Sequence, residues 1–345
     1  MKQGVKMDNQ PKRVALVTSG GDAPGMNAAV RAVVLAAHHF HIEVLGFFHG
    51  YNGLLDNDPT LLDLASVNDI IRLGGTILKS ARCPQFQTDT GLKQAANTLV
   101  KQHCDALIVI GGDGSFAGML ALKQYWDGQM IGIPGTIDND IDGTDATIGF
   151  STAVNTAIDA IDKIRDTANA FERIFIVELM GRHSGHITFN VGVACGAEQV
   201  LSFENFSADN REQKLRQLAQ EINSVQQTRH NSYILVIAEN VWPGGATELA
   251  RKLKETFAID STACVLGHIQ RGGSPDAKDR VLATKMGVGA IQALLNGETE
   301  IMIAEQDSRI CSVVLEQAIQ HQKKVNPNLV AAHENILAVT AQNQC

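Results

Sequence analysis

The chain has 345 residues, of which 44% are hydrophobic and 19% are charged, and its formal net charge at pH 7 is -8. This composition is typical of a globular protein, and the length exceeds what one compact core usually supports, so we expect two domains. Without a basic run, the acidic balance disfavours nucleic-acid binding, which needs clustered Lys and Arg.

The cysteines and the ends of the chain bear on its compartment. The six cysteines are scattered without a C-x-x-C pair, which predicts reduced thiols in a cytoplasmic protein rather than disulfides or a zinc site. The N-terminal residues lack an apolar signal core and the longest apolar runs are of strand length, so we expect neither secretion nor membrane insertion. His38, His39 and His41 have no acidic or cysteine partner nearby, and a solvated helix end is preferred to a metal cluster.

The first elements follow a strand, turn and helix plan. Residues 14–17 predict a buried strand, Gly20 and Gly21 form a turn, and a helix opens near Met26. Residues 106–125 repeat this plan. Two such units predict an α/β fold with an open, mostly parallel sheet that carries helices on both faces, and ligands of such sheets bind at the carboxyl ends of the strands.

An acidic segment follows at residues 134–150, PGTIDNDIDGTDATIGF. Its four aspartates are Asp138, Asp140, Asp142 and Asp145. The spacing from Asp138 matches the opening of a calcium loop, but the twelfth residue is Gly149, where such a loop needs a bidentate Glu. An EF-hand is therefore disfavoured.

The four carboxylates are expected to divide into two pairs. On an extended stretch Asp138 and Asp140 share a face, so that one accepts a proton from a substrate hydroxyl while the other orients it or binds a metal-bound water. Asp142 and Asp145 are interpreted as turn formers beside Gly143.

The second half of the chain predicts another α/β domain. A long amphipathic helix starts with Ser151 or Thr152 as its N-cap. Buried strands are predicted within residues 173–181 and 232–241, and a late helix stops at Gly297.

Both glycine-rich turns are candidates for phosphate binding, because backbone amides and a helix N-terminus approach an anion there. Neither turn matches the Walker or the dinucleotide pattern, and a tight α/β turn would explain either one alone. Each carries an aspartate, Asp22 or Asp113. Within GGDGS, Asp113 is interpreted as a ligand of magnesium that bridges nucleotide phosphates, with a helix N-cap as the alternative.

Arginines complete the chemical pattern. They are Arg82, Arg173, Arg182 and Arg271. An arginine at a strand end or in a glycine-flanked loop can fork onto a phosphate, although each one alone is more often a surface ion pair. Together with two phosphate loops and a carboxylate pair, they predict phosphoryl transfer between two anionic partners.

Five stretches give the sequence a family resemblance: TSGGDAPGMNAA, GGDGS, PGTIDNDIDGTDATIGF, MGRHSGH and GHIQRGGSP. In this order and spacing, the chain resembles the bacterial ATP-dependent 6-phosphofructokinases over roughly residues 13–320. The resemblance implies two Rossmann-like three-layer α/β/α domains with mostly parallel sheets. It places nucleotide binding in residues 12–149 plus about 268–318, and sugar-phosphate binding in residues 150–267 plus about 319–345.

The resemblance also implies an activity, in which ATP and fructose 6-phosphate become ADP and fructose 1,6-bisphosphate in glycolysis. Asp138 is then the base for the sugar's 1-hydroxyl, and the other implied catalytic residues are Thr136, Asp140, Arg82 and Arg182. The implied nucleotide site consists of Gly21, Arg82, Cys83, Asp113, Gly114, Ser115 and Gly118. Magnesium is implied at Asp113.

The implied sugar-phosphate site consists of Thr136, Asp138, Arg173, Met180, Gly181, Arg182, Glu239, His268 and Arg271. Arg173 matches an arginine that enters this site from a neighbouring subunit, which implies a homotetramer. Gly114 and Gly135 stand where similar pyrophosphate-using enzymes carry bulkier side chains, so the resemblance favours ATP as the donor.

Some positions depart from the family. Thr262 replaces a second arginine expected from the adjacent subunit, and losing one charged hydrogen bond costs roughly 1.5 to 3 kcal/mol. Gln87 stands where many relatives carry arginine, and Lys79 replaces a usual glycine. These changes leave open a related activity with pyrophosphate or another ketose phosphate. A silent regulator that binds nucleotide or sugar phosphate is disfavoured, because Asp138, Asp113 and Arg182 are all retained.

The regulatory site is matched less completely. The residues that fit its pattern are Arg31, Asp63, Arg165, Gly196 and Glu198. The residues that replace several basic residues of well-regulated relatives are Leu35, Asp58, Thr228, His230, Asn231 and Ser232. Because effectors with several phosphate charges need cations, we expect weak activation by nucleoside diphosphate and weak inhibition by phosphoenolpyruvate.

Overall fold

The computed structural model describes residues 11–229 and 232–342, so that His230 and Asn231 lie outside the described residues. The chain divides into two compact units. Among the described residues, unit 1 comprises those of Met1–Ile137, Ile141–Thr152 and Arg271–Lys323. Unit 2 comprises those of Asp138–Asp140, Ala153–Gln270 and Lys324–Cys345.

Unit 1 is built on an eight-stranded sheet in the order β12-β11-β5-β4-β1-β2-β3, with β6 paired to β5. Its strands are β1 (Arg13–Thr18), β2 (Glu43–Phe47), β3 (Pro59–Leu62), β4 (Ala106–Gly111), β5 (Gln129–Thr136), β6 (Ile148–Gly149), β11 (Ile301–Gln306) and β12 (Arg309–Val314). Only the outer pairs β2–β3 and β11–β12 are antiparallel among these strands. Every residue of β4 is buried, as a central strand covered on both faces requires.

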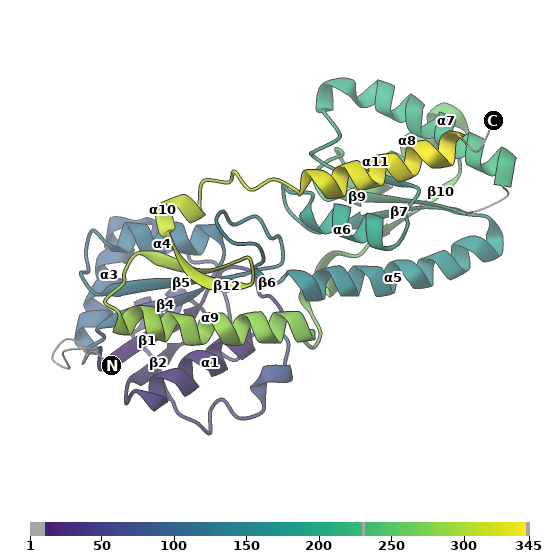
Figure 1. The fold of residues 1–345 in the computed structure, drawn as a ribbon. Helices are drawn as coiled ribbons and strands as arrows, with labels where there is room; N and C mark the ends of the chain where they lie inside the picture. The colour runs from purple at the N-terminus through teal and green to yellow at the C-terminus, as the bar shows by residue number, and fades with distance from the viewer. Residues whose placement is uncertain (1–10, 230–231, 343–345) are drawn as a thin grey trace. The chain divides into compact units, whose positions relative to one another are not determined.

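Helices cover both faces of this sheet (Figure 1). One layer consists of α1 (Met26–His39) and α9 (Ala277–Leu295). They pack closely at Gly287, where a Cβ atom would lie 2.6 Å from the Cβ of Ala32. The other layer consists of α2 (Tyr51–Asp56), α3 (Asp89–Lys101), α4 (Asp113–Leu122) and α10 (Leu315–Ala318), which share one hydrophobic cluster with the strands. Two 3-10 turns, η2 (Ile70–Arg72) and η3 (Pro84–Gln87), lie in the connections.

Unit 2 has a smaller sheet of four parallel strands in the order β10-β7-β9-β8. These are β7 (Ile174–Leu179), β8 (Gln199–Leu201), β9 (Tyr233–Ala238) and β10 (Ser261–Val265). Side chains of α7 (Arg211–Arg229) and α8 (Gly245–Phe257) form a hydrophobic cluster with the strands. Phe189 of α6 (His186–Ala194) packs with Val325, just before α11 (Pro327–Gln342), in a separate cluster. The short turns η4 (Ala208–Asn210) and η5 (Gly267–Arg271) follow, and the last residue of η5, Arg271, belongs to unit 1.

The long helix α5 (Phe150–Phe171) begins in unit 1 and continues in unit 2. Its start is capped by a side chain from α9, because the carboxylate of Asp279 accepts the backbone N–H groups of Gly149 at 2.9 Å and Thr152 at 2.8 Å. Asp279 is itself 1% exposed. The helix therefore starts at Phe150, before the predicted N-cap residues Ser151 and Thr152, and its cap is supplied from a distant part of the chain.

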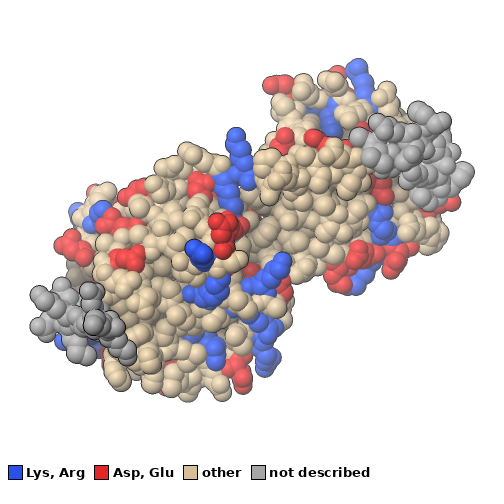
Figure 2. All heavy atoms as spheres, in the orientation of Figure 1, with Lys and Arg blue, Asp and Glu red and all other residues tan. Residues whose placement is uncertain are grey.

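The predicted α/β class with mostly parallel sheets and helices on both faces is confirmed. No helix among residues 11–229 and 232–342 has the length and apolarity needed to cross a membrane. Both acidic and basic side chains are scattered over each unit in Figure 2, with several Lys and Arg side chains gathered near one edge of unit 1.

Candidate active site

The sheet of unit 1 brings three turns to one edge. Strands β1, β4 and β5 are parallel neighbours and end at Thr18, Gly111 and Thr136. The two glycine-rich turns follow β1 and β4, and the acidic segment follows β5. The carboxyl edge of this sheet is where α/β folds bind ligands.

The second turn opens directly into a helix. Asp113 is the first residue of α4, and its side chain is 22% exposed. A Cβ atom on Gly114 would meet no other atom within 4 Å, whereas Ser115 is buried. The start of α4 therefore presents backbone N–H groups beside open space, an arrangement that suits a phosphate.

Two other predicted residues are held by packing. A Cβ on Gly118 would lie 3.0 Å from Tyr51 and 3.2 Å from Phe86, whose rings stack at 3.8 Å. A Cβ on Gly135 would lie 3.0 Å from both Ile110 and Met26. Any side chain at either position would displace these neighbours, so the protein core alone already favours glycine there.

The first turn is occupied by an arginine. The guanidinium of Arg271 donates to the backbone oxygen of Asp22 at 3.1 Å. Its Nη1 would lie 2.8 Å from a Cβ on Gly21, so a side chain at this position would displace the end of the Arg271 side chain. Arg271 belongs to unit 1, and the cation therefore lies beside the first phosphate-loop candidate.

Arg82 and Cys83 precede η3 on the same unit. Arg82 is exposed, and its backbone oxygen accepts a long 3.5 Å hydrogen bond from Asn52. Burial raises the pKa of the Cys83 thiol above its ordinary value of 9.0. The Cys83 thiol is thus protonated at neutral pH, a form that can pack against a ligand but is a poor nucleophile.

The residues present fit a magnesium ion carried mainly by a nucleotide. The partly exposed Asp113 carboxylate lies at the sheet edge, next to the amide groups that begin α4. The described residues include no group of three or more His, Cys, Asp or Glu side chains with metal-site geometry. Magnesium often uses one or two protein carboxylates and takes its remaining ligands from phosphates and water, so a single aspartate is compatible with it.

The sheet of unit 2 gathers a second set at its carboxyl edge. Strand β7 lies between β9 and β10. Residues Met180, Gly181 and Arg182 follow β7, Glu239 follows β9, and His268 lies in η5 beyond β10. The fold thus places four predicted sugar-phosphate residues on neighbouring strand ends, together with the exposed His268.

Asp138 is the buried carboxylate of this set. It is 1% exposed, and its Oδ2 lies 3.5 Å from Nε of Arg182, half of whose side chain is exposed. The hydroxyl of Ser184 lies 3.1 Å from the backbone oxygen of Asp138 and 3.2 Å from that of Gly181. A buried charge requires a partner, and the Arg182 guanidinium supplies one for this carboxylate.

The backbone that carries Arg182 is held from β9. Arg182 has the left-handed φ of 53°, which is costly for a residue with a side chain. Oε1 of Glu239 accepts the N–H groups of Gly181 at 3.1 Å and Arg182 at 2.8 Å. Asn240 donates its side-chain amide to the Arg182 oxygen at 3.2 Å. Two side chains therefore stabilise the strained conformation.

Gln270 fixes the residue before this bend. Its side chain is fully buried, and its Oε1 accepts the N–H of Met180 at 2.8 Å. Sequence reasoning missed Gln270, Asn240 and Ser184. Gln270 lies within the GHIQRGGSP stretch, and Asn240 directly follows Glu239. The only sequence signal for these two residues was that they lie next to predicted site residues.

The expectation that Asp138 and Asp140 share a face of an extended stretch is wrong. Strand β5 ends at Thr136, and Asn139 has a left-handed φ of 53°. The period-two argument needs extended backbone, and it fails at this bend. Asp138 is buried whereas Asp140 is half-buried, so the two carboxylates have different surroundings.

Thr136 accepts a side-chain hydroxyl at its backbone oxygen, whereas the later carboxylates accept backbone N–H groups. The Thr136 oxygen accepts the Thr147 hydroxyl at 2.6 Å, and Thr136 is 8% exposed. The carboxylate of Asp142 accepts the N–H of Gln322 at 2.9 and 3.0 Å. Oδ2 of Asp145 accepts the N–H of Asp307 at 2.8 Å. These two aspartates therefore do more than form the turn around Gly143, because they also hold the backbone at Asp307 and Gln322, which lie far away in sequence.

Arg173 lies apart from this set. It is exposed, and its guanidinium lies 4.5 Å from the ring centroid of Phe171, which is 64% exposed. Thr262, on the outer strand β10, is exposed as well. Lys79 and Gln87 are exposed on unit 1.

Part of the predicted regulatory set lies together in unit 2. Arg165 donates to Glu198 at 3.0 Å and to the Gly196 oxygen at 3.0 Å. Glu198 also accepts the N–H of Ile234 at 2.7 Å. The guanidinium of Arg165 is already hydrogen-bonded within the chain, which leaves less of it for an effector phosphate.

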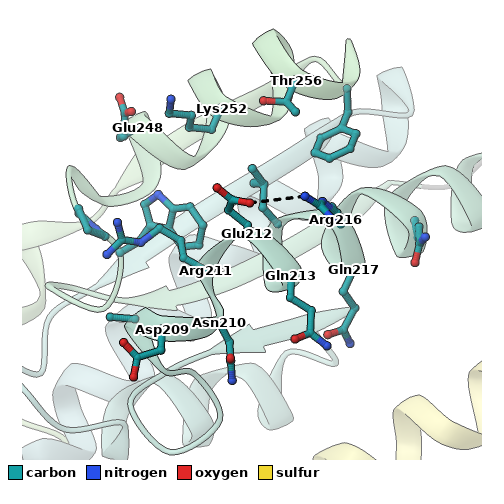
Figure 3. A pocket seen from close by; sticks show the side chains of 16 residues that line it. Asp209, Asn210, Arg211, Glu212, Gln213, Arg216, Gln217, Glu248, Lys252 and Thr256 are labelled. Carbon is teal, nitrogen blue, oxygen red and sulfur yellow. Dashed lines mark hydrogen bonds and ion pairs between the residues drawn. The ribbon is translucent and has the colours of Figure 1, made fainter.

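A groove of about 1270 Å³ lies between α7 and α8 of unit 2 (Figure 3). Its lining carries both charge signs, with Arg216 paired to Glu212 at 3.4 Å. None of the residues lining it is a predicted site residue. Concavity alone therefore does not locate the candidate site in this protein.

Comparison with known proteins gives a consistent family. A family model described as phosphofructokinase matches residues 13–294. The ATP-dependent 6-phosphofructokinase of Coxiella burnetii is 50% identical over 299 residues, which are 87% of this chain and 90% of that protein. The ATP-dependent 6-phosphofructokinase 1 of Thermus thermophilus is 44% identical over 319 residues, which are 92% and 97% of the two chains.

Solved structures agree in fold. Phosphofructokinase from Saccharomyces cerevisiae matches with a TM-score of 0.84 and 32% identity, covering 94% of this chain and 47% of that one. This chain thus spans about half the length of the yeast chain. A pyrophosphate-dependent phosphofructokinase from Marinobacter aquaeolei matches with a TM-score of 0.77 and 22% identity, covering 92% of this chain and 86% of that one. At this identity the likeness concerns the fold alone.

Proposed function

Because this chain belongs to the phosphofructokinase family, we propose that it transfers the γ-phosphoryl group of ATP to the 1-hydroxyl of fructose 6-phosphate. The products are ADP and fructose 1,6-bisphosphate, and the reaction is a step of glycolysis in the cytoplasm. The structural observation that supports this most directly is the buried Asp138 beside Arg182, at a distance of 3.5 Å. A binding protein would not need a base in this position.

Asp138 acts as the general base. It accepts the proton of the sugar's 1-hydroxyl while that oxygen bonds to phosphorus and the bond to the ADP oxygen breaks. Arg182 pairs with the Asp138 carboxylate and offers its guanidinium to the transferred group. Thr136 and Asp140 flank this base in sequence and complete the loop around the phosphoryl group.

The nucleotide binds at the carboxyl edge of unit 1. The turn from Gly111 into α4 receives phosphate oxygens, with open space above Gly114. Gly21, Cys83, Ser115 and Gly118 line or shape this edge, and Arg82 faces the developing negative charge. A magnesium ion held by Asp113 would neutralise phosphate charge on the nucleotide.

The sugar phosphate binds to the strand ends of unit 2. Met180, Gly181, Arg182, Glu239 and His268 hold it there. Arg271, which the family resemblance assigns to the sugar phosphate, belongs to unit 1, where its guanidinium donates to the Asp22 oxygen. Arg173 serves the site of a neighbouring subunit in a homotetramer. Its exposed position beside Phe171 is compatible with contact to another chain.

Subunit mixing tests the shared site. We expect Asp138→Ser and Arg173→Ala homotetramers to be weakly active alone. After co-refolding, a site with its own Asp138 and a neighbour's Arg173 regains activity, so the mixture exceeds the sum of its parents. A mixture no more active than that sum, in hybrids verified by native mass spectrometry, would place both residues in one subunit.

The proposed activity is tested by initial rates with magnesium present. ATP and pyrophosphate are each crossed with a panel of ketose phosphates that includes fructose 6-phosphate. We expect fast turnover with ATP and fructose 6-phosphate, and this outcome would make Thr262 a tolerated change. Preference for pyrophosphate or another sugar would redirect the assignment, and no turnover with any pair would overturn it.

Regulation is proposed to be weak. The several uncharged residues at the effector positions, and the internal bonds of Arg165 with Glu198, leave few cations for a phosphorylated effector. Rates at low fructose 6-phosphate should change less than about threefold with saturating ADP or phosphoenolpyruvate, a span of roughly 0.6 kcal/mol. Strong sigmoidal responses to both effectors would contradict this expectation.

A further inference from the structure

A segment near residue 320 reaches the start of α4. Leu315 and Ala318 of α10 are buried in the same hydrophobic cluster as Phe116 and Met119 of α4. Beyond α10, Nε2 of His321 lies 3.5 Å from Oδ2 of Asp113. All of these residues belong to unit 1. An imidazole thus lies against the carboxylate to which magnesium binding is proposed.

The acidic segment holds this histidine in place. Both carboxylate oxygens of Asp142 accept the N–H of Gln322, at 2.9 and 3.0 Å. The N–H of Asp142 donates to the Ala318 oxygen at 3.1 Å, and Nζ of Lys323 donates to the Asp145 oxygen at 3.3 Å. The backbone is therefore fixed on both sides of His321, which itself has a left-handed φ of 55°.

His321 combines a half-exposed side chain with a strained left-handed backbone, and strain of this kind is concentrated at functional sites. Side chains that hydrogen-bond to a metal-ligating group fix its orientation, and their loss typically weakens metal affinity by about 10- to 100-fold. The imidazole Nε2 of His321 and the carboxylate Oδ2 of Asp113 are a potential donor and acceptor, and they make a polar contact at 3.5 Å.

We infer that His321, held by Asp142, is a positioning residue that orients the Asp113 carboxylate for the metal–nucleotide complex. This inference rests on the proposed function. It assigns a role to the second half of the acidic segment, because the turn that follows the base also anchors the residue that orients the metal ligand.

The test measures binding of the Mn²⁺–ADP complex to the full-length enzyme by calorimetry and by the Mn²⁺ electron paramagnetic resonance signal. His321→Leu should weaken this binding at least tenfold. His321→Gln, which keeps an amide donor, should remain within about threefold of wild type. Binding of fructose 6-phosphate should be unchanged in both variants.

His103→Leu is the matched control. His103 is an exposed histidine with a left-handed φ of 53°, and it precedes β4, whereas Asp113 follows the opposite end of that strand. Six strand residues separate the two ends by about 20 Å. This control should bind Mn²⁺–ADP as wild type does, which isolates the contact with Asp113 from the effect of replacing a strained histidine.

A double-mutant cycle tests the anchor. Asp142→Ala should weaken Mn²⁺–ADP binding in the wild-type background and have little further effect beside His321→Leu, because both changes act on one contact. Circular dichroism and thermal unfolding of each variant confirm that the chain is folded. Additive losses would show that Asp142 does not act through His321 and would overturn the coupling.

Wild-type controls separate the two levels of inference. Wild-type enzyme that phosphorylates fructose 6-phosphate with ATP, together with unchanged Mn²⁺–ADP affinity in His321→Leu, would overturn the role of His321 alone. Equal losses in the Leu and Gln variants would overturn the orienting polar contact. Wild-type enzyme without ATP-dependent phosphorylation would overturn the proposed function, and the inference with it.

Discussion

Both halves of the acidic segment carry two aspartates, but the aspartates of the two halves have different surroundings in the folded chain. Asp138 and Asp140 group with unit 2, whereas Asp142 and Asp145 group with unit 1. Asp138 is buried 3.5 Å from a guanidinium. Asp142 and Asp145 bind backbone N–H groups of residues more than 150 positions later in the chain.

The difference shows that the group which a carboxylate contacts, rather than its spacing in the sequence, decides whether the carboxylate serves catalysis or stabilises the fold. A carboxylate that accepts backbone N–H groups stabilises a chain conformation, and its loss should change stability before turnover. A buried carboxylate beside a guanidinium can exchange a proton with substrate, and its loss should change turnover before stability. Variants at matched positions test this comparison.

The largest effect is expected at Asp138. Asp138→Ser should lower kcat by about 10³- to 10⁴-fold, because general base catalysis is lost. The affinity for fructose 6-phosphate, measured by calorimetry, should stay close to that of wild type. A kcat within tenfold of wild type would remove Asp138 from the mechanism and erase the distinction between the two halves.

Asp279 sharpens the comparison as a buried carboxylate with a backbone role. It accepts the N–H groups of Gly149, at the end of the acidic segment, and of Thr152, in the first turn of α5. Asp279→Asn places an amide group against one of these donors and should lower the free energy of unfolding by about 2 kcal/mol at neutral pH. Urea denaturation followed by circular dichroism measures this change.

The same variant should alter the pH dependence of stability. Burial raises the pKa of Asp279 above its ordinary value of 3.8. The folded state then binds more protons than the unfolded state, so the wild-type stability contribution falls as pH rises from about 4 through the raised pKa. The stability advantage of wild type over Asp279→Asn should therefore shrink across this window. An advantage that grows with pH would contradict the role of burial.

Asn240 tests whether the chemical half needs its backbone supports. Asn240→Gly keeps a residue that tolerates the left-handed φ of 64° but removes the donor to the Arg182 oxygen. We expect kcat to fall up to about tenfold, equivalent to one hydrogen bond of about 1.4 kcal/mol. Steady-state kinetics with saturating substrates measure the effect. Unchanged kcat would show that Glu239 alone holds the Arg182 backbone.

Asp145 should give the smallest effect. Asp145→Ala removes one exposed acceptor for the Asp307 N–H and should lower the free energy of unfolding by about 1 kcal/mol. Because this carboxylate holds backbone, kcat should equal that of wild type. A large loss of kcat with unchanged urea denaturation would break the comparison by giving the second half a chemical role.

Much of the fold could be predicted from the sequence because its signals are local. Residues 14–17 lie within β1, and Gly297 follows the end of α9 as predicted. Buried strands and glycine-rich turns carry their own pattern in consecutive residues. The exact start of α5 could not be predicted, because its cap is Asp279, more than 120 residues away.

The candidate site was predictable to a smaller degree. Sequence motifs selected Asp113, Asp138 and Arg182, but the extended-strand argument for Asp138 and Asp140 failed at the bend around Asn139. The supports Gln270 and Asn240 carry no signal of their own. Their role depends on hydrogen bonds across neighbouring strands, which only the folded chain reveals.

The sequence by itself determined the fold class, the family resemblance and the residue types that phosphoryl transfer needs, because hydrophobic period, turn chemistry and motif order are properties of consecutive residues. The tertiary structure decided which carboxylate meets a guanidinium, which ones bind backbone, and that His321 reaches Asp113. These outcomes depend on contacts between residues dozens to hundreds of positions apart, and burial and hydrogen-bond geometry exist only once the chain has folded.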